Sequence, residues 1–172
     1  MNVLKGHHFE ELLLLDRAMI GHFKHIIWDW NGTLLDDVEL SLDIMNKQIG
    51  KYGLPSVSVE EHREKFVFPI VNYYLALGFD PARIPSSGIH PKWREEYEQR
   101  LGEARLHPRS EELLKHFFDR GTGQSILSAH GESELLNALR FFGVDRYFFR
   151  MFGLDNPGCS KVLRGRELVA EL

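Results

Sequence analysis

The sequence predicts an α/β fold in which helices cover a parallel sheet and a helical segment is inserted into the chain. The segment 25–30 has the β-branched and aromatic content of a buried strand, and two further strands are predicted over 124–128 and near 147–152. Helical patterns separate the last two strands and follow the third. Strands that alternate with helices through short connections are typical of parallel sheets with right-handed crossovers.

Three parts of the chain are expected in sequence order. Residues 1–24 form an N-terminal extension, in which an amphipathic helix is predicted over 9–21. Residues 25–36 and 106–172 form the core with the sheet, and residues 37–105 form the helical insertion. The insertion therefore interrupts the core after its first strand.

The first strand runs into the turn Asn31-Gly32, which places Asp29 at its carboxyl end. Ligands of open parallel sheets collect at the carboxyl ends of the strands. Asp29, Ser128 and the neighbourhood of Asp155 are the polar positions at such ends. An Asp followed by Asn-Gly is by itself ordinary turn chemistry, so only a combination of these positions indicates a site.

Helical spacing and stop signals predict the helices of the insertion. The apolar residues of the first helix are Val38, Leu42, Met45, Ile49 and Tyr52. Ser58 and Glu61 can form a capping box for the second helix, Pro69 can open a third that stops at Gly78, and Tyr97 belongs to the last. An aromatic group expected mostly in the core comprises Phe66, Phe68, Tyr73 and Tyr74.

After the insertion, turn residues delimit five further elements. They are a helix over 110–120, a strand over 124–128, a helix over 132–142, a strand near 147–152 and a helix from Ser160. Arg164 and Arg166 are expected on a solvated face of that last helix.

Composition excludes several classes of protein. The 172 residues carry a formal net charge of -4, with the cations scattered among acids, so a nucleic acid is not expected as a partner. The apolar runs are too short for a membrane span or a signal peptide, so no membrane association is expected. The single cysteine, Cys159, allows no disulfide within the chain. We expect a cytoplasmic globular protein.

Three segments, in this order, resemble the signatures of the haloacid dehalogenase-like hydrolase superfamily. The first has Asp29 followed by Gly32-Thr33 and an apolar pair, the second has Ser128 at the end of a strand, and the third has Lys161 at the start of a helix. The helical insertion resembles the small cap of the phosphoglycolate phosphatase branch. The resemblance implies a Rossmann-like three-layer core, with the insertion as a helical cap.

The resemblance also implies an activity, that of a Mg²⁺-dependent phosphatase acting on a small phosphorylated metabolite. Asp29 would attack phosphorus and form an aspartyl-phosphate, Asn31 occupies the position of the family's acid/base, and Lys161 would neutralise both Asp29 and the phosphate. Asp29 and Asn31 would hold the Mg²⁺. The residues that would bind the phosphate are Gly32, Thr33, Ser128 and Ala129.

Two departures from the family pattern bear on activity. Asparagine cannot exchange a proton, so Asn31 predicts weak turnover unless Asp36 or His130 substitutes. The family's fourth signature, an acidic pair, lies on a strand after the lysine helix, and the sequence ends at Leu172 within that helix. We therefore expect a core that is incomplete at its C-terminus, a weak metal site, and an exposed edge on the first strand that a second copy of the chain could cover as a homodimer.

Other interpretations are compatible with the same residues. The two departures favour a catalytically inactive fragment, or a binding or structural relative of the family. Mutases, phosphonatases and dehalogenases share the three signatures, although Asn31 argues against a mutase, which needs the second acid. A dinucleotide-binding module is not supported, because no G-x-G-x-x-G follows a predicted strand.

Overall fold

The computed structural model describes residues 24–67, 70–80, 90–154 and 160–172. The predicted helix over 9–21, together with Phe68, Pro69, Asp155 and Cys159, lies outside these residues. The described residues divide into two compact units, one within 24–36 and 106–172 and the other within 37–105. No helix within the described ranges has both the length and the apolar character needed to cross a membrane.

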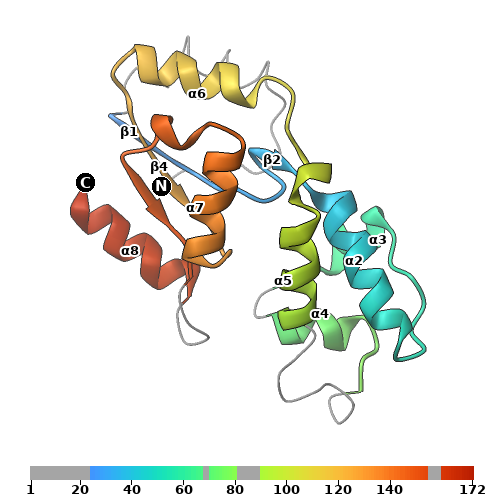
Figure 1. Cartoon of the computed structure of the whole chain (residues 1–172). Helices are drawn as coiled ribbons and strands as arrows, with labels where there is room; N and C mark the ends of the chain where they lie inside the picture. The colour runs from blue at the N-terminus through green and yellow to red at the C-terminus, as the bar shows by residue number, and fades with distance from the viewer. Residues whose placement is uncertain (1–23, 68–69, 81–89, 155–159) are drawn as a thin grey trace. The chain divides into compact units, whose positions relative to one another are not determined.

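The first unit is built on a parallel three-stranded sheet with the strand order β1-β4-β5 (Figure 1). The strands are β1 (His25–Trp28), β4 (Gly123–Leu127) and β5 (Arg150–Phe152). The helices are α6 (Ser110–Asp119), α7 (Glu132–Phe141) and α8 (Lys161–Glu171). Trp28 pairs with Ile126 and Leu127 pairs with Phe152, so the three strands end together at one edge of the sheet.

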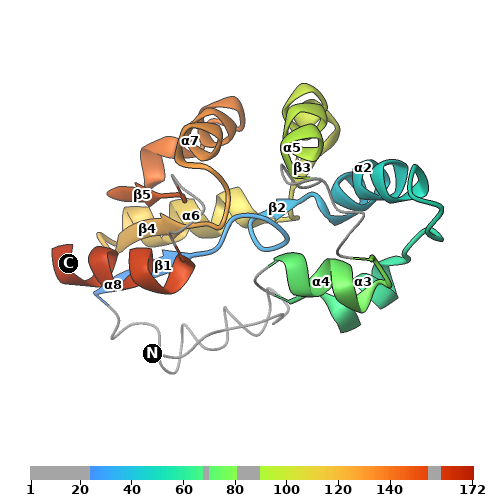
Figure 2. The same cartoon turned by 90° about the horizontal axis from the view of Figure 1, so that it is seen from below.

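The sheet separates α6 from α8. Ile26 and Trp28 of β1 pack against Leu113 and Phe117 of α6. Gln124 shares this face, because its side chain donates a hydrogen bond to the carbonyl of Leu114 in α6. Leu127 has the opposite parity in β4 and meets α8, where a Cβ added at Gly165 would lie 3.1 Å from Leu127 Cδ2. This arrangement confirms the predicted three-layer α/β core, which Figure 2 shows from below.

The predicted strand near 147–152 is partly wrong. Asp145–Tyr147 forms a 3₁₀ helix, η4, and the strand begins only at Arg150. The N–H of Phe148 donates to the carbonyl of Asp145 at 3.1 Å, which closes a helical turn within the aromatic run. Aromatic content indicated a strand there, but this local hydrogen bonding shortens β5 to three residues.

The second unit is helical apart from short connections. Its helices are α2 (Val38–Gly50), α3 (Val59–Lys65), α4 (Ile70–Ala76) and α5 (His90–Gln99), followed by the 3₁₀ helix η3 (Leu101–Glu103). Ser58 caps α3 as predicted, because its hydroxyl accepts the N–H of Glu61 at 3.1 Å. Two short strands that were not predicted, β2 (Leu35–Asp36) and β3 (Arg105–Leu106), pair with each other, and β2 and Leu106 belong to the first unit.

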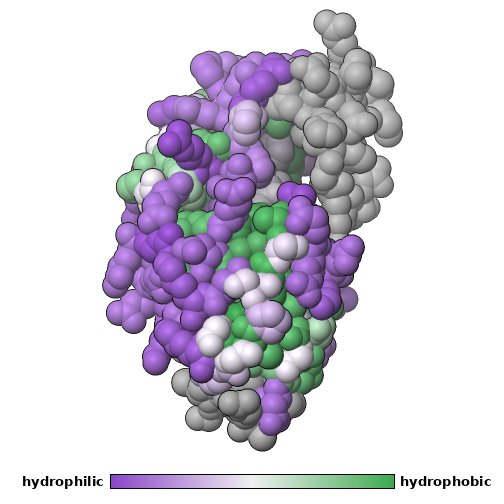
Figure 3. All heavy atoms as spheres, turned by 90° about the vertical axis from the view of Figure 1, so that its right-hand side faces the viewer, coloured by the Kyte–Doolittle hydropathy of each residue, from purple (hydrophilic) through white to green (hydrophobic). Residues whose placement is uncertain are grey.

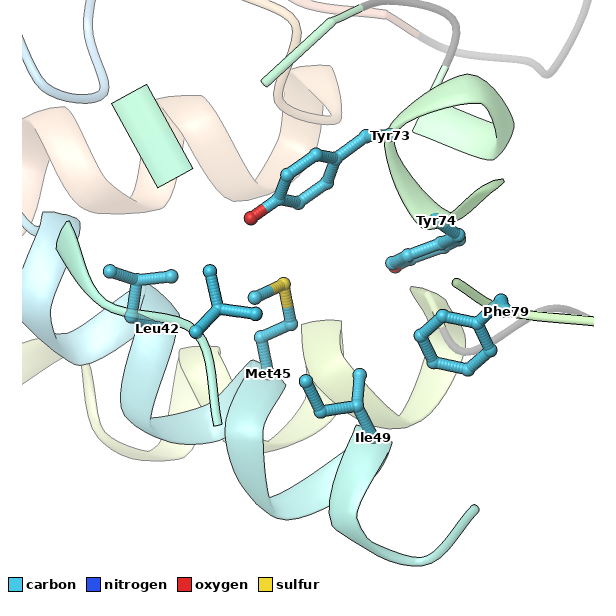
Figure 4. Close-up of a cluster of buried hydrophobic side chains, with 7 residues drawn as sticks. Leu42, Met45, Ile49, Tyr73, Tyr74 and Phe79 are labelled. Carbon is cyan, nitrogen blue, oxygen red and sulfur yellow. The ribbon is translucent and has the colours of Figure 1, made fainter. Parts of the chain in front are cut away.

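The second unit has a hydrophobic core of its own (Figure 4). Residues from α2 and from the α4 region form it: Leu42, Met45, Ile49, Val57, Tyr73, Tyr74 and Phe79. Burial of Tyr73 and Tyr74 confirms their predicted place in the core. Phe66 is the exception, because this residue is 41% exposed beside Val67, with Val71 and Leu75 of α4 also exposed. Figure 3 shows apolar side chains gathered on the molecular surface among hydrophilic ones.

Candidate active site

Asp29 follows β1 and forms an ion pair with Lys161, the first residue of α8. Lys161 Nζ lies 2.6 Å from Asp29 Oδ1, and the two side chains are 35% and 45% exposed. The same oxygen accepts the N–H of Trp30 at 2.8 Å. Both interactions engage Oδ1, and Oδ2 makes no hydrogen bond or ion pair with a described residue. Asp29 is therefore oriented through one oxygen while the other faces away from these partners.

The turn after Asp29 is organised around the carbonyl of Trp30. This carbonyl accepts the N–H groups of Thr33, Leu34 and Leu35 at 3.0 to 3.2 Å, and the ring of Trp30 is buried. Gly32 has a φ of 66°, a left-handed conformation that glycine adopts without the strain a side chain would bring. Thr33 is exposed, and because its amide is already engaged, its hydroxyl is the group it can offer a ligand.

Ser128 and Asn31 meet at the ends of the first two strands of the sheet. The Ser128 hydroxyl donates to Asn31 Oδ1 at 3.3 Å and accepts the N–H of His130 at 3.0 Å. Ser128 is almost fully buried, and its own N–H donates to the carbonyl of Phe152 in β5. Ala129 follows in the same loop and is half-buried. The structure thus brings together two pairs of predicted site residues, Asp29 with Lys161 and Asn31 with Ser128.

Lys161 reaches Asp29 because α8 begins at that point. Ser160 is the N-cap, and its hydroxyl accepts the N–H of Leu163 at 3.2 Å. The helix N-terminus adds its partial positive charge to that of the ammonium. The positive charge of the ammonium and of the helix N-terminus lies beside the strand end and the glycine turn. A phosphate group requires positive charge of this kind.

The oxygen donors at this site fit the ligand chemistry of Mg²⁺ only in part. Mg²⁺ takes oxygen ligands, keeps several waters and is commonly held by one or two carboxylates plus substrate phosphate. Asp29 Oδ2 and the oxygens of Asn31 are donors of this kind. Among the described residues, however, no group of three or more His, Cys, Asp or Glu side chains could hold a metal ion. Among the described residues, Asp29 and Asn31 are the predicted ligands of such a cation, which would also depend on the phosphate of the substrate.

The two candidates for a substitute acid/base have other contacts. Asp36 in β2 lies 3.8 Å from His107 Nε2, and the amide of His130 is bound to Ser128.

The prediction for Arg164 is wrong, because its side chain is only 17% exposed and is bound by several groups near the strand ends. Arg164 lies three residues after Lys161 on the same helix face, and this spacing could have predicted that its side chain lies near the strand ends. Arg166 is exposed, as predicted.

A carboxylate paired with an ammonium at the carboxyl ends of parallel strands is a site for anionic ligands in an α/β core. Residues 26–161 match the family model described as haloacid dehalogenase-like hydrolase. The match covers more than half of the chain and contains all seven predicted site residues. The chain belongs to the haloacid dehalogenase-like hydrolase family, as the three signatures predicted. No curated protein matches the sequence significantly.

Solved structures share the fold at low sequence identity. A predicted phosphatase from Clostridium acetobutylicum has a TM-score of 0.71 and 17% identity, over 87% of this chain and 71% of that one. A predicted phosphoglycolate phosphatase from Haemophilus somnus has a TM-score of 0.66 and 17% identity, with the same coverage. CbbY from Rhodobacter sphaeroides, solved with phosphate, has a TM-score of 0.66 and 18% identity over 87% and 73%.

Proposed function

We propose that the protein is a Mg²⁺-dependent phosphatase of small phosphorylated metabolites, in the phosphoglycolate phosphatase-like branch of its family. The observation that carries the proposal is the 2.6 Å pair between Lys161 and Asp29 at the end of β1, within a chain of this family. In this proposal residues 37–105 are the family's cap. The phosphate held by CbbY, a protein of similar fold, supports an anionic phosphate as the ligand.

In the first step Asp29 Oδ2, the oxygen not engaged by Lys161, attacks phosphorus. A bond forms between this oxygen and phosphorus while the bond to the ester oxygen breaks, giving an aspartyl-phosphate and an alkoxide or phenolate. The Lys161 ammonium offsets the charge of the phosphate and keeps Asp29 oriented. Four residues at the strand ends contact the phosphate in this proposal: Gly32, Thr33, Ser128 and Ala129.

In the second step water hydrolyses the aspartyl-phosphate and regenerates the Asp29 carboxylate with inorganic phosphate. Asn31 can orient groups through its amide, as it does with Ser128, but it holds no exchangeable carboxyl proton. In this proposal the proton that the leaving ester oxygen takes up after the first step therefore comes from water. When bound between Asp29, Asn31 and the phosphate, Mg²⁺ would supply charge neutralisation.

The test is hydrolysis of p-nitrophenyl phosphate by the full chain, with Mg²⁺ and with EDTA. We expect activity that requires Mg²⁺ and falls below detection in Asp29→Asn, which keeps the shape of the side chain but removes the nucleophile. Asp119→Asn, at an exposed carboxylate on α6, is the matched control and should retain full activity. Equal rates for the parent chain and Asp29→Asn would refute Asp29 as the nucleophile.

A second candidate function is a catalytically inactive relative that binds phosphorylated ligands. Asn31 favours it, because an asparagine lacks the proton-exchanging group that turnover uses. Isothermal titration with inorganic phosphate in the presence of Mg²⁺ distinguishes the two. Binding that Lys161→Met abolishes, without hydrolysis of any phosphate ester, would establish the inactive relative.

A further inference from the structure

The inference concerns Arg164, which lies one helical turn after Lys161. Residues three apart in a helix share a face, so both side chains point toward the strand ends. Arg164 is the more enclosed of the two, with 17% of its side chain exposed against 35% for Lys161. The proposed chemistry uses Lys161 and leaves Arg164 without a role.

Arg164 contacts three different elements. Its guanidinium lies over the ring of Phe152 at 4.3 Å, and Nε donates to the carbonyl of Gly153 at 3.2 Å. Nη2 donates to Glu132 at 2.5 Å, and Nη1 donates to Glu167 at 2.7 Å. One side chain thereby joins the end of β5, the start of α7 and its own helix.

The joined segments pack closely even without the arginine. The N–H of Leu154 donates to the carbonyl of His130 at 2.7 Å. A Cβ added at Gly153 would lie 2.6 Å from the backbone nitrogen of Glu132 and 2.8 Å from the carbonyl oxygen of His130, so only glycine fits. Arg164 thus attaches α8 to a rigid backbone contact between the loops that follow β4 and β5, and the first of these loops begins with Ser128.

The pair between Lys161 and Asp29 cannot by itself fix the start of α8. Both side chains are more than one-third exposed, and exposed ion pairs contribute about 0 to 1 kcal/mol. Lysine also has four flexible side-chain bonds that must be held for the ammonium to stay in place. The cap at Ser160 acts only within the helix. Packing of α8 on the sheet at Gly165 and Leu168 fixes the body of the helix, and contacts from its first turn to the strand ends set where Lys161 stands.

We propose that Arg164 is a positioning residue, which holds the first turn of α8 against the loops after β4 and β5 and so keeps Lys161 on Asp29. The inference rests on the proposed phosphatase function for its effect on rate. A purely stabilising arginine would make the same contacts, so the test must show that its effect passes through Lys161.

The first experiment is a double-mutant cycle on the full chain with p-nitrophenyl phosphate and Mg²⁺. Arg164→Met keeps the apolar stem on Phe152 and removes the hydrogen bonds. We expect it to lower kcat by about 10- to 100-fold with KM changed less than about twofold, because a misplaced catalytic group affects the transition state. In a Lys161→Met background the same substitution should have no further effect on kcat. An equal loss in both backgrounds would overturn the proposal.

Two further variants serve as a control and as a conservative replacement in this double-mutant cycle. Arg166→Met, on the exposed side of the same helix, should leave kcat unchanged. Arg164→Lys keeps the charge but carries all its donors on one nitrogen, which cannot reach the acceptors that Nε, Nη1 and Nη2 of the arginine bind, so it should show an intermediate loss of kcat. If Arg164→Met does not fold, Arg164→Lys with and without Lys161→Met gives the same cycle.

The second experiment needs no activity and is amide hydrogen exchange on the substrate-free chain. Arg164→Met should raise the exchange rates of the Leu163 and Leu154 amides by about tenfold or more, whereas Arg166→Met should not. The Gly123 amide, at the other end of β4, is the internal reference. A parent chain without phosphatase activity would refute the proposed function alone. Unchanged exchange in Arg164→Met would overturn the positioning role.

Discussion

At the scale of single residues, Asn31 most strongly shapes the chemistry expected of this chain. It stands two positions after Asp29, the proposed nucleophile, and Ser128 binds it through a hydroxyl that donates to Asn31 Oδ1. An asparagine there preserves the hydrogen-bonding geometry while removing the proton transfer that a carboxyl group provides. The consequence falls on the leaving group, because an alkoxide needs a proton far more than a phenolate does.

This reasoning predicts a change in substrate preference for Asn31→Asp. Hydrolysis of glycerol 2-phosphate should rise by about 10²- to 10⁴-fold, the usual contribution of general acid/base catalysis. Hydrolysis of p-nitrophenyl phosphate should rise much less, since p-nitrophenolate leaves without protonation. Steady-state kinetics of both esters measure the ratio, with Asn137→Asp on the exposed side of α7 as the control. An equal rise for both esters would show that position 31 does not protonate the leaving group.

The residues of the site differ in how far sequence could predict them. Asp29 and Lys161 belong to recognisable signatures, and the structure places them in direct contact. Arg164 has no signature, and two arginines on a charged helix usually indicate a solvated face. Its burial depends on Phe152 and Glu132, which come from other elements and become neighbours only in the folded sheet.

At the scale of elements, a buried hydrogen bond joins the two ends of the helical unit. Tyr97 of α5 donates to Asp37 Oδ2 at 2.6 Å, directly before α2, and both residues are buried. Tyr97 also stacks on Trp93 with ring centroids 4.7 Å apart. A buried carboxylate that loses one of its donors loses part of the hydrogen bonding that offsets its desolvation.

We therefore predict that Tyr97→Phe destabilises the chain by about 1–3 kcal/mol. The ring and its stacking are kept, so the loss reports on the hydroxyl alone. Tyr52→Phe is the matched control, because Tyr52 packs on Phe79 and its hydroxyl makes no hydrogen bond to a described residue. Urea unfolding followed by circular dichroism gives both values. A loss below about 0.5 kcal/mol for Tyr97→Phe would show that Asp37 is satisfied in another way.

Helices with a long apolar stripe or clear turn residues at their ends were predicted correctly, whereas very short elements were missed. The stripe from Val38 to Ile49 predicted α2, and turn residues placed α6 and α7 to within a residue or two. The two-residue strands β2 and β3 carry too little pattern to be recognised. Residues 147–149 have the aromatic content of a strand, but the N–H groups of Tyr147 and Phe148 donate to carbonyls three residues before them in a local turn.

At the scale of the whole molecule, each compact unit contains a partly enclosed histidine with a lowered pKa. His25 of β1 shares a 2.8 Å hydrogen bond with Ser125, and burial lowers its pKa from 6.5. His62 of α3 shares one of 2.8 Å with Tyr73. Burial lowers the pKa of His62, and nearby Arg63 lowers it further. Both histidines are therefore neutral partners in the folded chain.

The lowered pKa values of His25 and His62 predict that the folded chain loses stability in acid. A folded-state pKa below the unfolded value of 6.5 means that the unfolded chain binds more protons as the pH falls through this range. The contribution of both histidines to stability is complete above pH 6.5 and is lost as the pH falls toward their folded-state pKa values.

We expect the free energy of unfolding to be lower at pH 5.5 than at pH 7.5, and the difference to shrink in His25→Gln and His62→Gln. Urea titrations at each pH measure it. Between pH 7.5 and 8.5 the parent and both variants should show the same dependence, which separates the histidines from other groups. If the variants lose as much stability as the parent between pH 7.5 and 5.5, the acid sensitivity belongs to other residues.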